Sequence, residues 1–242
     1  MRIAPFLSLL FLPMRTPAVD FEHTIPPACG QMVLVTTAVW STSAATVRRF
    51  ERAAAAASWM QVGKPVPALL GERGLAWGIG LHTVPRDAVP HKREGDRRSP
   101  AGVFRITEAF GAAGKLAGLK LPVRPLTATL EAIDDPASHF YNRIVDRAKT
   151  AQPDWNSSER MVAMPDYGLG LVVAHNPRCV PGAGSCIFLH LWSGKRRGTA
   201  GCTVLRERDL TLLARWLDAA REPVLVQLPQ AEVPPLISAR GF

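Results

Sequence analysis

The sequence predicts one mainly β domain, a sandwich or barrel, with a helix packed against it near the C-terminus. The 242 residues are 47% apolar and 20% charged, which provides enough apolar side chain for one sizeable core. Nineteen glycines and twenty-one prolines disfavour an all-helical bundle, because glycine weakens helix interiors and proline breaks them. Short apolar runs bounded by glycine or proline recur along the chain, a pattern typical of a sandwich or barrel.

The first strands are expected in the N-terminal third of the chain. Residues 32–39 are rich in β-branched side chains, 46–50 alternate loosely, and 59–62 lead into Gly63. The alanines at 53–57 favour a helix by propensity alone, but their flanks place them in or beside a hairpin turn.

The remaining elements follow the same reasoning. Further apolar runs predict strands at 75–81, 103–106, 169–174, 187–192 and 224–228. One amphipathic helix is expected from Glu207 to Ala220, ended by Pro223. Its core-facing residues recur at spacings of three and four and are Leu210, Leu213, Ala214 and Leu217.

Two regions stand outside this pattern. Residues 116–165 are polar and studded with proline, so they form either a functional lid or binding loop or a surface insertion. Residues 1–25 have a basic start, an apolar middle and small residues near Ala18, the layout of a secretory signal. An ordinary N-terminal strand is the alternative. The main domain is then expected over 31–230, followed by a tail at 231–242.

The net charge of +9 predicts attraction to a polyanion such as nucleic acid, an acidic membrane face or an anionic cell wall. We expect no nucleic-acid partner, because no basic–aromatic surface motif is present. No membrane span is expected, because no apolar run approaches about 20 residues.

The densest chemistry lies around Cys202, which follows Gly201 and has His190 on a preceding strand. A free thiol titrates near pH 8.5, so an adjacent imidazole or cation must favour the thiolate nucleophile that we expect here. Gly201 lets a backbone N–H approach a developing oxyanion. The alternative is a buried structural cysteine beside a core histidine.

A metal site and a disulfide are rival explanations for the other cysteines. His175, Cys179, Cys186 and His190 are zinc-ligand types, but their spacing matches no common finger, and we expect no metal or cofactor. In an exported protein, Cys179 and Cys186 could instead form a disulfide, with Cys29 as a competing partner.

Four segments follow one another along the chain, and they are Lys92-x-Glu94-Gly95-Asp96, Ser99-Pro100-x-Gly102-x-Phe104, Phe188-Leu189-His190 and Thr199-Ala200-Gly201-Cys202. In this order they resemble the L,D-transpeptidase catalytic-domain family of the YkuD type. The resemblance covers residues 32–229.

The resemblance implies a monomeric, cofactor-free bacterial enzyme of the periplasm or cell wall, acting in wall biogenesis and cell shape. Cys202 would attack a peptidoglycan stem peptide and release D-alanine, and His190 would move the proton. Backbone N–H groups at Gly201 and Cys202 would hold the oxyanion. An amine acceptor then gives a 3-3 cross-link, whereas water makes the protein an L,D-carboxypeptidase or related murein-peptide hydrolase.

The chain departs from the family pattern at Ala200, where many members have histidine, and at Val204, where they have arginine or asparagine. Other side chains are therefore expected to bind substrate, and a non-catalytic wall-binding protein remains an alternative. The substrate-binding candidates are His82, His175, Glu94, Asp96, Thr199 and Arg197. For the first four a structural role is the alternative, with the two histidines ending strands and the two carboxylates pairing with neighbouring basic residues. The basic runs at 97–98 and 195–197 predict electrostatic steering of anionic stem peptides, with turnover falling as salt rises.

Overall fold

A computed structural model of the chain describes residues 24–84, 88–192, 194 and 198–233. Most of the predicted leader, the end of the tail and the candidate Arg197 therefore lie outside the described residues. Within those ranges, no helix has both the length and the apolar character needed to cross a membrane.

The fold is mainly β, as predicted. The strands are β1 (Gln31–Thr37), β2 (Ala44–Glu51), β3 (Met60–Leu69), β4 (Leu75–Trp77), β5 (Ser99–Gly111), β6 (Val123–Pro125), β7 (Leu130–Ala132), β8 (Ile144–Asp146), β9 (Glu159–Arg160), β10 (Leu169–Val173), β11 (Phe188–Leu191), β12 (Thr203–Leu205) and β13 (Val224–Pro229). The α-helices are α1 (Ala113–Leu116) and α2 (Glu207–Trp216). The 3-10 turns are η1 (Arg147–Lys149), η2 (Met161–Ala163), η3 (Pro165–Tyr167), η4 (Ala219–Arg221) and η5 (Gln230–Glu232).

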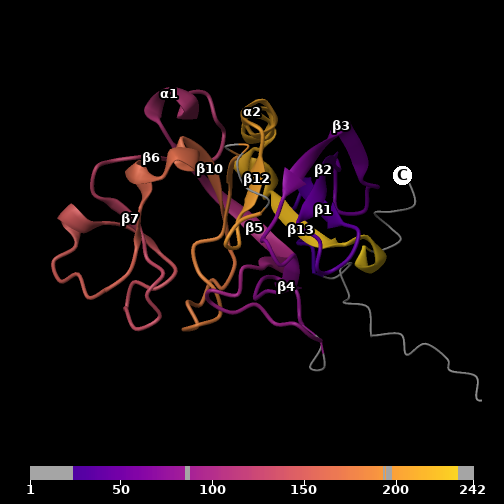
Figure 1. The fold of residues 1–242 in the computed structure, drawn as a ribbon. Coiled ribbons are helices and arrows are strands. Elements are labelled where there is room, and N and C mark those ends of the chain that lie inside the picture. The colour runs from indigo at the N-terminus through magenta and orange to yellow at the C-terminus, as the bar shows by residue number, and fades with distance from the viewer. Residues whose placement is uncertain (1–23, 85–87, 193, 195–197, 234–242) are drawn as a thin grey trace, which may run out of the picture.

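The main sheet closes on itself as a barrel. Its strands follow the order β10-β11-β12-β3-β2-β1-β13-β5, and β5 pairs back to β10, while β4 and β6 add to β5 (Figure 1). β5 closes the ring because its first half pairs with β13 and its second half with β10. β1 is buried at every position, which matches its apolar, β-branched sequence and its place between β2 and β13.

Two predicted elements are shorter than expected. α2 ends at Trp216 and not at Ala220, because Leu217 and Asp218 are extended and the Asp218 carboxylate caps η4. The run at 75–81 gives only the three residues of β4. The alanines at 53–57 lie in the turn between β2 and β3, as their flanks predicted.

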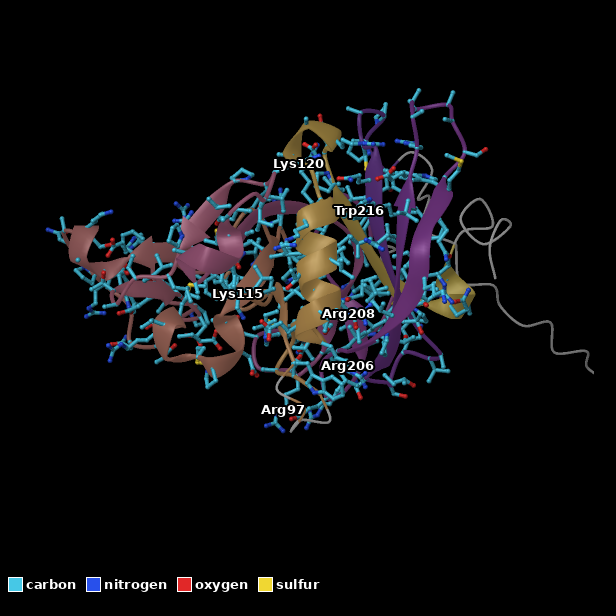
Figure 2. The ribbon with its side chains drawn as sticks, turned by 90° about the horizontal axis from the view of Figure 1, so that it is seen from above. Arg97, Lys115, Lys120, Arg206, Arg208 and Trp216 are labelled. Atoms are coloured by element: carbon cyan, nitrogen blue, oxygen red, sulfur yellow. The ribbon has the colours of Figure 1, made fainter. Side chains whose placement is uncertain are left out.

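Helix α2 buries Leu210, Leu213 and Ala214 in the core. In Figure 2, Arg206 and Arg208 lie at its N-terminal end and Trp216 at the opposite end, where the Arg49 guanidinium lies 5.6 Å from the Trp216 ring. The Lys115–Glu207 ion pair, 2.6 Å long, links α2 to α1.

The polar segment at 116–165 is largely an insertion beside the barrel, drawn in pink and orange shades in Figure 1. Its three-stranded sheet has the order β8-β7-β9. A second apolar cluster joins it to the barrel, with Met161 and Leu130 from the insertion packing with Phe110 and Phe188. Complete burial of one such phenylalanine is worth about 1.5–3 kcal/mol. The insertion is therefore fixed to the barrel at the end where β10 and β11 lie.

Candidate active site

Parallel pairing of β11 with β12 brings the histidine and the cysteine together. Leu189 pairs with Thr203 and His190 with Val204, so Cys202, one residue before β12, lies beside Phe188. The N–H of Phe188 donates to Cys202 Sγ at 3.3 Å. Because side chains alternate along a strand, Phe188 and His190 share a face of β11. Cys202 lies on that side too, because it packs against the same apolar cluster as Phe188.

Cys202 is a partly buried, free thiol at the edge of the second apolar cluster. Its Sγ donates to the carbonyl of Cys186 at 3.6 Å. The pKa of the Cys202 thiol is raised to about 12, mainly by burial and secondly by the Glu159 carboxylate, whereas the Phe188 N–H and the Lys92 ammonium act to lower it. Desolvation and the charge of Glu159 thus favour the neutral thiol, whereas the sequence suggested a thiolate.

The turn before Cys202 is held by two hydroxyls. Thr199 Oγ1 donates to the Cys202 carbonyl at 2.6 Å and accepts from the Gly201 N–H at 3.1 Å. Ser99 Oγ donates to the same carbonyl at 3.2 Å and accepts from the Gly71 N–H at 2.8 Å. The backbone that presents the sulfur is thus anchored from both sides.

His190 is buried, and its Nδ1 lies 3.0 Å from the carbonyl of Leu191. An Nδ1–H that donates there leaves Nε2 as the proton acceptor, the form a general base requires. The Tyr167 ring meets the imidazole edge-on, with centroids 5.1 Å apart, and the Tyr167 hydroxyl donates to Glu159. A thiol and an oriented imidazole therefore share one desolvated corner of the barrel.

Comparison with known protein families agrees with this geometry. The family described as the YkuD L,D-transpeptidase catalytic domain matches residues 71–226, more than half of the chain. The chain belongs to this family. No curated protein matched the sequence. The family resemblance predicted from the four segments is thus confirmed.

Within this L,D-transpeptidase-family domain, His82 and His175 are core residues. His175 Nδ1 accepts from the Ile79 N–H at 3.3 Å, and its Nε2 lies 3.0 Å from the Ala183 carbonyl. Burial lowers the pKa of His175 to about 4 and also lowers that of His82. His82 lies against Gly102, with Nδ1 accepting from the Val103 N–H at 3.1 Å.

The Lys-x-Glu-Gly-Asp segment forms a compact turn near Gly201, where a Cβ would lie 3.8 Å from Lys92 Cε. Lys92 Nζ donates to Asp96 at 2.6 Å, and the same carboxylate accepts from the N–H groups of Arg93 and Arg98. Glu94 accepts from Tyr141 Oη and from Ser185 Oγ. The polar atoms of Glu94, Asp96 and Thr199 are therefore bonded within the protein, and their contact with substrate stays a prediction.

The two rival explanations for the other cysteines can now be compared with the geometry. Cys29, Cys179, Cys186 and Cys202 are all free, so no disulfide joins Cys179 to Cys186 or to Cys29. Among the residues that the structure describes, no group of three or more His, Cys, Asp or Glu side chains has the arrangement of a metal site. The two ring nitrogens of His175 are directed at backbone groups and not at Cys179 or Cys186.

Three residues of the site escaped the sequence analysis. Tyr167 and Glu159 lie in the poorly patterned segment or directly after it, and no motif marks them. Ser99 belongs to a quoted segment, so its position was visible, but its contact with Cys202 spans 103 residues of chain. The predicted Arg197 lies among the residues that are not described.

Proposed function

We propose that this protein is an L,D-transpeptidase that cuts and joins peptidoglycan stem peptides through a thioester on Cys202. The observation that carries the proposal is the shared face of Cys202 and His190, with Nδ1 of His190 held by the Leu191 carbonyl. Membership of the L,D-transpeptidase family supports the same substrate class. The predicted export to the periplasm or cell wall, where this substrate lies, is part of the proposal.

The first half-reaction forms the acyl-enzyme. Nε2 of His190 takes the Sγ proton as Cys202 attacks the carbonyl carbon between the third stem residue and D-alanine. The carbon–nitrogen bond then breaks, and the imidazolium returns its proton to the departing amine. D-alanine leaves, and a thioester joins the peptide to Sγ.

The second half-reaction transfers the acyl group. An amine from a neighbouring stem attacks the thioester carbonyl and gives its proton to His190, and the carbon–sulfur bond breaks. His190 then returns this proton to Sγ, so the enzyme regains its starting form. The product is a 3-3 cross-link; attack by water would instead give a trimmed tripeptide.

The high pKa of Cys202 shapes this mechanism. A thiol with a pKa of about 12 is scarcely ionised at neutral pH, so proton transfer to His190 must accompany attack and not precede it. The Gly201 N–H already donates to Thr199, which supports the Cys202 N–H as the main oxyanion donor. Gly201 then serves by allowing close approach of the turn to its neighbours.

The test is mass spectrometry of purified muropeptides incubated with wild type, Cys202→Ala and His190→Gln. We expect 3-3 dimers and a thioester on the Cys202 peptide with wild type, and neither product with the two variants. Cys179→Ala is the matched control, because it removes another free, partly exposed thiol and should retain both products.

The possible outcomes separate the related functions. Trimmed tripeptides without dimers identify an L,D-carboxypeptidase with the same site. The proposal is rejected if folded wild type binds muropeptides but forms no thioester, and if Cys202→Ala binds muropeptides equally well. That result identifies a non-catalytic wall-binding protein.

A further inference from the structure

The catalytic imidazole needs more than one constraint to stay in line with the sulfur. The contact between His190 Nδ1 and the Leu191 carbonyl fixes one ring atom, and packing against the ring plane adds a second constraint. A displacement of about 1 Å can cost about 100-fold in rate, because attack and proton transfer need aligned atoms. The neighbour that supplies this packing is Tyr167.

Tyr167 packs between the two residues that flank the nucleophile. Its ring meets His190 with centroids 5.1 Å apart and planes at 73°, and meets Phe188 at 5.6 Å and 88°. Phe188 in turn donates its N–H to Cys202 Sγ. The Tyr167 ring is buried, so lateral movement would open a gap in a packed cluster.

The hydroxyl of Tyr167 is anchored from the insertion. It donates to Glu159 Oε2, and Glu159 lies on β9, whose partner in the small sheet is β7. Tyr167 itself ends η3, directly before β10 of the barrel. One hydrogen bond thus links the insertion to the Tyr167 ring, which packs against His190 and Phe188.

We propose that Tyr167 is a positioning residue for His190. In this proposal the carboxylate of Glu159, which belongs to the insertion, holds the Tyr167 ring in place against the imidazole. This inference rests on the proposed role of His190 as the proton acceptor. Burial, together with Cys202 and Glu159, raises the pKa of Tyr167, so its hydroxyl remains a donor throughout the working pH range. The insertion then contributes to catalysis through the contact between Glu159 and Tyr167.

The experiment compares Tyr167→Phe, Tyr167→Leu, Glu159→Gln and the double variant Tyr167→Phe/Glu159→Gln. Tyr167→Phe keeps the ring and loses the anchor, and we expect kcat to fall roughly 10-fold with KM nearly unchanged. Tyr167→Leu also loses the ring and should fall further, roughly 100-fold. Glu159→Gln retains an amide oxygen that accepts from the hydroxyl, so it should keep more activity than Tyr167→Phe.

The double variant should be no slower than Tyr167→Phe, because the contact that Glu159→Gln weakens is already absent in Tyr167→Phe. Tyr141→Phe is the matched control, since Tyr141 is also buried and donates to a carboxylate, that of Glu94, but has no ring contact with His190. It should lose comparable stability and keep kcat within about 3-fold. Equal losses of kcat in Tyr141→Phe and Tyr167→Phe would overturn the inference.

A second readout needs no peptidoglycan. The rate at which iodoacetamide alkylates Cys202 at pH 7 reports the proton acceptor beside the sulfur, and Tyr167→Phe should lower it about as much as kcat. Unchanged alkylation and unchanged kcat would show that Tyr167 is only a packing residue. A third outcome separates the two proposals. If Tyr167→Phe slows alkylation but wild type forms an acyl-enzyme with none of the muropeptides, the positioning role stands and the proposed function fails.

Discussion

The Ser99 hydroxyl donates to the carbonyl of Cys202 at 3.2 Å and joins two segments that lie 103 residues apart in the chain. Ser99 begins β5, which pairs with four other strands and closes the barrel, so the turn that carries Cys202 is fixed to this strand. The same hydroxyl accepts from Gly71, the first residue of the family match.

Ser99→Ala should therefore reduce both stability and activity. Ser99 is fully buried, so loss of its hydroxyl leaves the Gly71 N–H without an acceptor. The free energy of unfolding should fall by about 1–3 kcal/mol. Denaturant unfolding measures this cost, and kcat should fall more than KM rises. Thr199→Ser is the control, because serine retains the other hydroxyl that donates to the Cys202 carbonyl. Unchanged stability in Ser99→Ala would show that the bond contributes little.

Glu159→Gln should make Cys202 more acidic. The carboxylate raises the pKa of the Cys202 thiol, so removing its charge should lower that pKa and move the alkylation-versus-pH curve toward lower pH. The measurement is the iodoacetamide rate between pH 6 and 10. Glu108→Gln, which removes a carboxylate paired with Arg124, is the control and should leave the curve in place. A curve that moves toward higher pH in Glu159→Gln contradicts the proposed charge effect.

Gly201→Ala should impair the site while the barrel still folds. A Cβ at this position would lie 3.2 Å from Ile187 Cδ1 and 3.3 Å from the Arg98 carbonyl, so these neighbours or the turn must move by a few tenths of an ångström. Overpacking of this kind costs about 1–3 kcal/mol. Gly114→Ala, where nothing lies within 4 Å of the added atom, is the control. We expect thioester formation to fall at least about 10-fold in Gly201→Ala alone, measured by intact-protein mass spectrometry.

Acid should destabilise the fold through His175. Its pKa falls from an ordinary 6.5 to about 4, because protonation would place a charge in the core. Between these values the unfolded chain binds more protons, so stability is full above pH 6.5 and falls as pH drops toward 4. The slope for one such group is at most about 1.4 kcal/mol per pH unit. Thermal unfolding across this range measures it, and a midpoint that rises on acidification would refute the account.

Apolar spacing and turn residues determined most of the fold. The runs that predicted β1, β10, β11 and β13 succeeded, because buried strands need continuous β-branched and aromatic sequence. The four family segments, with Cys202 and His190 among them, could likewise be found without coordinates, and the family they indicated matches the chain.

Tertiary structure alone decided what surrounds the sulfur. Desolvation and the charge of Glu159 raise the pKa of the Cys202 thiol, although the neighbouring histidine and basic residues suggested a thiolate. Tyr167 reaches His190 only because the insertion and η3 pack against β11, and the Ser99 hydroxyl reaches Cys202 only because the barrel closes. Sequence spacing fixes which face of a strand a side chain occupies, whereas burial, charge proximity and contacts between distant segments depend on how all the strands assemble.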